Sequence, residues 1–158
     1  MSSPDNLPDC LVLLDGLIQP VRLQISGIAI SAPGTIDTDQ SIIYYRGTLP
    51  FLHEFMVRDY FAKTYGLPAT ALNDGKAAVL AETATGNLEG CQNAAALVLG
   101  TGLGGGLVLN GQLYQGSHFQ AGELTFLLPP KLAEIEIEEM RGVEVSAVGL
   151  IHRLAEVL

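Results

Sequence analysis

Two carboxylates and one amide stand where they could do chemistry on a hydroxyl group. Asn73 and Asp74 directly follow an apolar stretch, and Glu123 follows a glycine in the segment AGEL. A carboxylate can act as a general base, and ionised carboxylates and amides hydrogen-bond hydroxyl groups. Ordinary roles compete with these: Asp74 could cap a helix after an Asn-Asp-Gly turn, and Glu123 could be a solvated loop residue. The residues alone leave both alternatives open.

Glycines are concentrated in the stretch LVLGTGLGGGLVLNGQLYQG, residues 97–116. Three of them match G-x-G-x-x-G, but a dinucleotide fingerprint needs a helix after the glycines. Here an apolar stretch and the turn signal Asn110-Gly111 follow, which predict a β-hairpin. A Walker A loop is excluded because no Lys-Ser/Thr pair follows the glycines.

Two explanations of this glycine-rich stretch remain. One is a tight hairpin whose glycines adopt unusual backbone angles. The other is a loop whose backbone N–H groups converge on an anion, with the Thr101 hydroxyl as an additional donor. The second accounts better for the number of glycines and for the threonine. We therefore predict a phosphate-binding loop in a β-turn-β setting.

The segments that must position these residues alternate between strand and helix patterns. This order predicts an α/β layer fold, and 158 residues fit one domain. A helix is expected in the second half of residues 5–19, and the Pro33-Gly34 pair predicts a turn after a strand buried on both faces. The predicted strands are 21–31, 41–45, 69–73, 94–99 and the hairpin 105–116, and the predicted helices are 48–66, 76–86 and 143–158.

Composition restricts the class of protein. The net charge is −9 with only eight Lys and Arg, which argues against binding nucleic acid or anionic membranes. No apolar run approaches the roughly 18 residues of a membrane-spanning helix, and no signal peptide pattern precedes the chain. A cytoplasmic protein is therefore expected. The two cysteines lie far apart and outside metal-binding or disulfide spacings.

Several motifs together resemble the ROK family, which contains bacterial sugar kinases and related repressors. LGTGLGGGLVLNGQLYQGSHFQAGEL is similar to the family's second phosphate motif and the sugar-contact segment after it. GIAISAPGTIDTDQSII, TLPF and GLPATALNDGKAAVLAE resemble the family's Pro-Gly corner and hairpin, its Asn-Leu-Pro segment and its Asn-Asp pair with a following helix. The resemblance covers roughly residues 5–128, with the motifs in matching order and spacing.

The resemblance implies a ribonuclease H-like (actin-like ATPase / sugar kinase) α/β fold, with a mixed sheet and flanking helices, incomplete at both ends. It implies an ATP-dependent hexose kinase in which Asp74 is the general base towards the attacking sugar hydroxyl. Mg²⁺ bound with ATP would cancel phosphate charge. The implied sugar contacts are Gly34, Thr48, Asn73, Asp74 and Glu123. The implied contacts to the ATP phosphates are Thr101, Gly102, Gly104 and Gly105.

The sequence also departs from the family's pattern. No Asp-x-Gly-Gly-Thr phosphate motif occurs in residues 1–30, so one wall of the nucleotide cleft is absent from the sequence. Phe126 stands in the place of a histidine that often ligates zinc, and the family's cysteine cluster is absent from 127–158. No structural zinc is therefore expected. Thr48 stands where asparagine is common.

These departures lead us to expect a partial chain, with a ROK-like core over 1–128 and the start of a missing remainder over 129–158. Such a fragment would phosphorylate nothing by itself. The alternatives are a non-catalytic sugar-binding or sugar-sensing module, and a degenerate fragment without a ligand. The sugar is not specified, and a homodimer is left open because members of the family are often dimers. Lys76 is expected to be solvated in the first turn of a helix, and Tyr45 and His53 to be packing residues.

Overall fold

The computed structural model describes residues 4–44, 48–100 and 102–124, together with positions 147, 151 and 155, which are helical. The chain divides into two compact units, Met1–Asn73 and Asp74–Leu158. The boundary predicted at 128/129 and most of the helix predicted over 143–158 lie outside the described residues. Within the described ranges, no helix is both long and apolar enough to cross a membrane.

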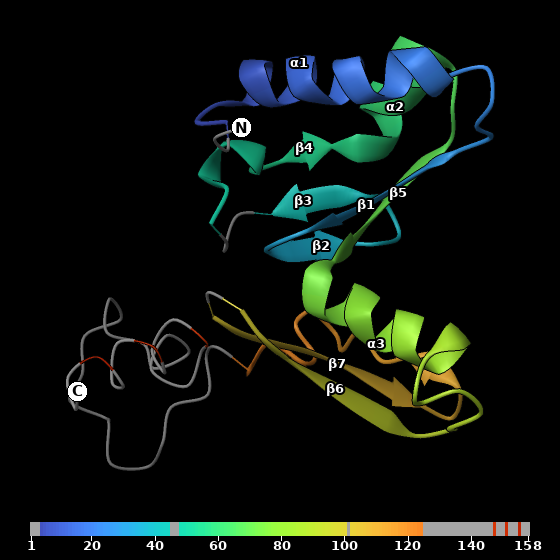
Figure 1. The fold of residues 1–158 in the computed structure, drawn as a ribbon, viewed down its shortest axis with the longest axis vertical. Helices are drawn as coiled ribbons and strands as arrows, with labels where there is room; N and C mark the ends of the chain where they lie inside the picture. Colours follow the sequence, from blue (N-terminus) through green and yellow to red (C-terminus); the bar gives the residue numbers. More distant parts are fainter. Residues whose placement is uncertain are drawn as a thin grey trace. The chain divides into compact units, whose positions relative to one another are not determined.

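The first unit combines two helices with a parallel strand pair and an antiparallel meander (Figure 1). β1 and β5 pair in parallel from Ile28↔Ala69 to Ala32↔Asn73, while β2, β3 and β4 pair antiparallel in that order. The elements are α1 (Leu7–Ile18), η1 (Gln19–Val21), β1 (Ile28–Ala32), β2 (Thr35–Asp37), β3 (Ile42–Tyr44), η2 (Pro50–Leu52), β4 (Phe55–Met56), α2 (Val57–Tyr65) and β5 (Ala69–Asn73). The predicted α/β class is confirmed.

Local capping groups set the ends of both helices in this unit. The Asn6 side chain accepts a hydrogen bond of 2.9 Å from the backbone N–H of Asp9 and so begins α1. Gly66 ends α2 in the left-handed region with φ 69°, where glycine pays no steric cost. The Arg22 guanidinium donates twice to the Tyr65 carbonyl, at 3.0 and 2.8 Å, and so satisfies a carbonyl of the last turn.

Two predicted elements of this unit were wrong in extent. The strand predicted over 21–31 begins only at Ile28, because the preceding residues form η1 and a turn, and its burial alternates along the strand. The helix predicted over 48–66 begins at Val57. The chain before it turns at Glu54 (φ 58°), and Phe55–Met56 then pairs with β3. Strand pairing here overrides the local helix pattern.

The core of the first unit lies beneath α2. Val57 and Phe61 are fully buried, and Phe61 stacks on Tyr65 with ring centroids 5.6 Å apart. Tyr60 meets Phe61 edge-on at 5.2 Å, a favourable arrangement for aromatic rings. This cluster fixes α2 on the strands and thereby the position of β5, which follows it.

The second unit places one helix on an antiparallel sheet. Its elements are α3 (Asp74–Thr85), β6 (Ala94–Leu99), β7 (Leu103–Leu109) and β8 (Gln112–Leu113), with strand order β6-β7-β8. The predicted hairpin is present: Asn110 and Gly111 have φ values of 53° and 75°, as its tight turn requires. α3 covers one face of β6 and β7 (Figure 1).

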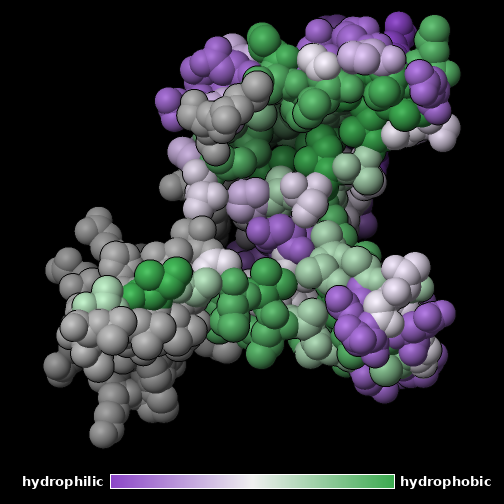
Figure 2. All heavy atoms as spheres, in the orientation of Figure 1, coloured by the Kyte–Doolittle hydropathy of each residue, from purple (hydrophilic) through white to green (hydrophobic). Residues whose placement is uncertain are grey.

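The other face of β6 is apolar and exposed among the described residues. Leu97 and Leu99 are 68% and 55% exposed, and burial alternates along the strand. Figure 2 shows hydrophobic atoms gathered over the front of the β6–β7 sheet. Among the described residues, α3 packs on one face of the sheet, and these exposed leucines of β6 lie on the other.

The glycines of β7 let α3 approach the strand closely. A Cβ built on Gly75 would lie 2.5 Å from the backbone nitrogen of Gly105, and one built on Gly106 would lie 2.5 Å from Cγ1 of Val79. Real Cβ atoms do not come this close to a backbone atom. Part of the glycine-rich stretch is thus explained by contact between a helix and a strand.

Gly75→Ala is expected to destabilise this unit by about 1–3 kcal/mol, because the added methyl group meets backbone that cannot move aside. Urea denaturation measures the effect as a lower midpoint. Gly100→Ala is the matched control, since nothing lies within 4 Å of a Cβ at that position. An unchanged midpoint for Gly75→Ala would contradict the close packing.

Candidate functional site

The first unit brings together two of the residues predicted to contact sugar. Asn73, at the end of β5, is only 5% exposed, and its side-chain amide donates a 3.1 Å hydrogen bond to the carbonyl of Gly34. Gly34 has φ 102° at the Pro33-Gly34 corner, a conformation that favours glycine. Thr48 is exposed in the bend before η2.

In the second unit, Asp74 is the exposed first residue of α3. Its Oδ1 accepts a 2.9 Å hydrogen bond from the N–H of the next residue, Gly75. A typical capping side chain instead accepts from an N–H two or three residues further on. The carboxylate is thus accessible at the start of the helix.

Glu123 combines burial with an unsatisfied oxygen. Its Oε1 is buried and has no hydrogen-bond partner within the described part of the chain. Burial raises the pKa of the Glu123 carboxyl above its ordinary value; the charge of Lys76 lowers it, and the charge of Asp74 raises it. The structure therefore brings Asp74 and Glu123 close enough for their charges to interact. A buried polar atom without a partner is costly and calls for an explanation.

The structure contradicts the solvent exposure predicted for Lys76. This residue was expected to be solvated, but it is 1% exposed, and its ammonium donates to the carbonyl of Phe119 at 2.5 Å. Burial lowers the pKa of Lys76, and the nearby Glu123 carboxylate raises it. The short polar pattern around Lys76 gives no signal of this burial, because a loop more than forty residues further along the chain creates it.

The glycines predicted to contact phosphates fall into two environments. Gly102 lies at the tip of the β6–β7 hairpin, where its carbonyl accepts a 3.0 Å hydrogen bond from Gly100. A Cβ on Gly104 would meet its first neighbour only at 3.8 Å, whereas one on Gly105 would lie 2.9 Å from the Ala96 carbonyl oxygen. Gly105 therefore has a packing role. Thr101 lies outside the described residues, as do Tyr45 and Phe126.

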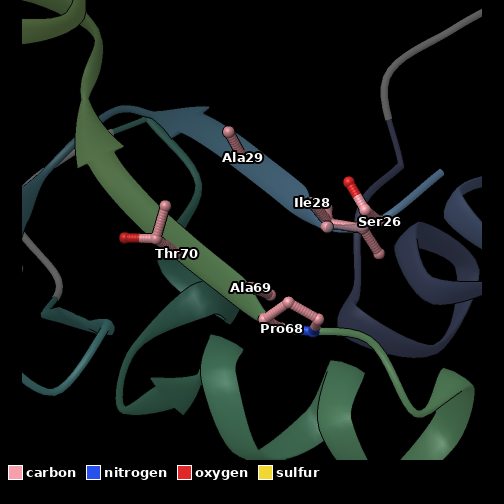
Figure 3. Close-up of a pocket in the computed structure, with 7 residues that line it drawn as sticks. Ser26, Ile28, Ala29, Pro68, Ala69 and Thr70 are labelled. Atoms are coloured by element: carbon pink, nitrogen blue, oxygen red, sulfur yellow. The ribbon is translucent and has the colours of Figure 1, made fainter.

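A separate hollow lies at the amino-terminal ends of β1 and β5 (Figure 3). Its volume is about 420 Å³, and none of its lining side chains is ionisable. Asn73 lies at the opposite, carboxyl-terminal end of β5. The hollow therefore offers no acid–base chemistry. It is lined by Ser26, Gly27, Ile28, Ala29, Pro68, Ala69 and Thr70.

Among the described residues, no group of three His, Cys, Asp or Glu side chains could hold a metal ion. The positions of Phe126 and of residues 127–158 that bear on a zinc site fall almost entirely outside the described part. The first unit therefore offers an amide, and the second unit offers carboxylates, a buried ammonium and glycine backbone.

Comparison with known proteins assigns the chain to a family. The model of the ROK family matches residues 6–135, which confirms the resemblance of the motifs, and the chain belongs to this family. A β-glucoside kinase of Listeria monocytogenes is 34% identical over 103 residues, which cover 65% of this chain and 35% of the relative. The chain is thus similar to sugar kinases in sequence.

Solved structures agree with this fold. The Lmo2764 protein of Listeria monocytogenes, described as a candidate N-acetylmannosamine kinase, has a TM-score of 0.87 and 25% identity over 99% of this chain. A ROK family glucokinase from Streptomyces griseus, solved with glucose and AMPPNP, has a TM-score of 0.71 and 22% identity over 80% of this chain. The chain spans 54% and 41% of these two structures.

Proposed function

We propose that this chain forms part of an ATP-dependent sugar kinase in which Asp74 is the general base. The Asp74 carboxylate would take the proton of one sugar hydroxyl as its oxygen attacks the γ-phosphorus of ATP. A bond forms between that oxygen and phosphorus, the bond from phosphorus to the β–γ bridging oxygen breaks, and ADP leaves. The exposure of Asp74 at the start of α3 supports this role, because a base must reach its substrate.

Glu123 carries the sugar side of the proposal. Its buried Oε1 without a partner among the described residues is a ready acceptor for a sugar hydroxyl, and the Asp74 charge raises the pKa of Glu123. In the first unit, the proposed sugar contacts are Asn73, Gly34 and Thr48. This orphaned acceptor close to an accessible carboxylate is the observation that carries the proposal.

The glycine hairpin would bind the phosphates of ATP. Backbone N–H groups of glycine-rich loops can approach a phosphate closely, and Gly104 has no side chain to block that approach. Thr101 and Gly102 would add contacts at the hairpin tip, and the packing of Gly105 would hold the strand in place. Mg²⁺ bound with ATP would neutralise phosphate charge.

A screen of sugars against the full-length polypeptide that carries this sequence tests the proposal. Release of ADP from Mg·ATP is followed with common hexoses, amino sugars and β-glucosides, each against a no-sugar control. At least one sugar is expected to stimulate ADP release. If none does while sugars still bind, a non-catalytic sugar-binding module replaces the kinase.

Sugar affinity is expected to fall as the pH is lowered, starting above the ordinary range of a glutamate. The pKa of Glu123 is raised, so its carboxylate gains a proton at a higher pH than usual and then loses acceptor capacity. Calorimetric titration of sugar at a series of pH values, from neutral pH down to the lowest at which the protein stays folded, measures this change. Glu123→Gln should remove the dependence; a wild-type affinity that is constant over this range would contradict the role of Glu123.

A further inference from the structure

A buried lysine connects α3 to the loop that carries Glu123. We propose that Lys76 is a positioning residue for sugar binding: it holds the loop of residues 114–124 in place and presents a positive charge to Glu123. This inference rests on the proposed function, in which Glu123 accepts a hydrogen bond from the sugar. Lys76 itself would touch neither the sugar nor ATP.

The contact of Lys76 with Phe119 fixes the middle of the loop. The ammonium donates to the Phe119 carbonyl, and Phe119 has a φ of 56°, which is rare for a bulky residue. Such a conformation persists only where its surroundings determine it. The charge-assisted hydrogen bond from buried Lys76 is strong enough to help hold Phe119 in this conformation.

The rest of the loop is closed by backbone hydrogen bonds. The N–H of Ala121 donates to the Gln115 carbonyl at 3.1 Å, and the N–H of Glu123 donates to the Gln120 carbonyl at 3.2 Å. Gly122 has φ 83° and packs so closely that a Cβ there would lie 2.8 Å from the Gly105 carbonyl oxygen. The loop that carries Glu123 is therefore held by β7 at Gly122 and by Lys76 at Phe119.

Lys76 also sets the electrostatic surroundings of Glu123. The charged groups that act on Glu123 in the described structure are Lys76 and Asp74, both on α3, with opposite effects on its pKa. His118, on the loop itself, is exposed. Loss of the lysine charge would leave burial and Asp74, which both raise the pKa of Glu123. Glu123 would then be protonated at a higher pH than in the wild-type protein.

Lys76→Met in the full-length protein tests this inference, because methionine keeps an unbranched side chain but loses the charge and the donor. The KM for the sugar is expected to rise by about tenfold or more, since a hydrogen bond to a charged group and its alignment are lost. The KM for ATP should change less than about twofold, because no ATP contact is removed. The acid limb of kcat/KM for the sugar should move to higher pH. Lys63→Met, at an exposed lysine of α2, is the matched control.

Two further variants separate the outcomes. Lys76→Arg retains charge and donor and should return the acid limb towards the wild-type position. Lys76→Gln retains a donor without the charge, so it should still show the shifted limb even if Lys76→Met does not fold. A wild-type protein with no sugar-dependent ADP release would overturn the proposed function and this inference together. An active wild type with an unshifted limb in Lys76→Gln would overturn the role of Lys76 alone.

Discussion

Replacing Asp74 with asparagine is expected to lower kcat by about 10²- to 10⁴-fold, the usual effect of removing a general base. Asparagine has nearly the same shape, and its side-chain oxygen can still accept from the N–H of Gly75, so the start of α3 should be preserved. It cannot accept a proton at neutral pH. Sugar binding should therefore persist while phosphoryl transfer is lost.

Steady-state kinetics and calorimetry on the same preparations measure this separation of turnover from binding. Asp59→Asn, at an exposed aspartate of α2, serves as the matched control and should leave kcat unchanged. Turnover in Asp74→Asn at the wild-type rate would remove Asp74 from the mechanism. Equal losses in kcat and in sugar affinity would instead assign Asp74 to substrate binding.

Replacing Glu123 with alanine is expected to raise the KM for the sugar by about 10- to 100-fold, the equivalent of one hydrogen bond to a charged group. The same change should lower the free energy of unfolding less than it weakens sugar binding. It removes a buried oxygen that has no partner among the described residues, although buried Lys76 loses a nearby opposite charge. A side chain kept for function behaves in this way, whereas a structural side chain loses stability when it is removed.

Sugar kinetics and thermal unfolding, measured side by side, decide between these roles of Glu123. Glu89→Ala provides the control at an exposed glutamate between α3 and β6. A normal KM for the sugar together with a lower melting temperature would show that Glu123 supports only the loop. A raised KM with only a small change in melting temperature is the predicted result.

The elements predicted correctly are those that local chemistry determines. Asn110 and Gly111 need positive φ values in a two-residue turn, so the hairpin of β7 and β8 follows from two residues. The alanine-rich stretch after Asp74 forms α3, and Gly66 ends α2. Asn73 and Gly34, both predicted to contact sugar, are joined by a hydrogen bond from the Asn73 amide to the Gly34 carbonyl.

The elements predicted wrongly depend on contacts between distant parts of the chain. Phe55 and Met56 pair with β3, and no local sequence pattern predicts that pairing. Lys76 is buried because a loop far along the sequence offers it the carbonyl of Phe119. Hydrophobic periodicity describes one element at a time, so it cannot predict the strand pairing of Phe55–Met56 or the burial of Lys76.

The glycines of β7 show how one pattern can serve two purposes. Their number suggested a phosphate-binding loop, yet Gly105 and Gly106 are required by the approach of α3 and of the turn at Gly122. Gly104 has no such packing demand, because a Cβ there would be in ordinary contact distance of its neighbours. The proposal for phosphate contacts therefore rests on the tip of the hairpin more than on its middle.

Formation of a sugar phosphate is the most direct test of the proposed kinase. Phosphorus NMR of the full-length protein with Mg·ATP and a stimulating sugar follows the γ-phosphate itself. A phosphate monoester signal coupled to sugar protons, growing in step with ADP, is the predicted result. Growth of ADP with inorganic phosphate and no ester would show hydrolysis of ATP, and would contradict transfer to a sugar.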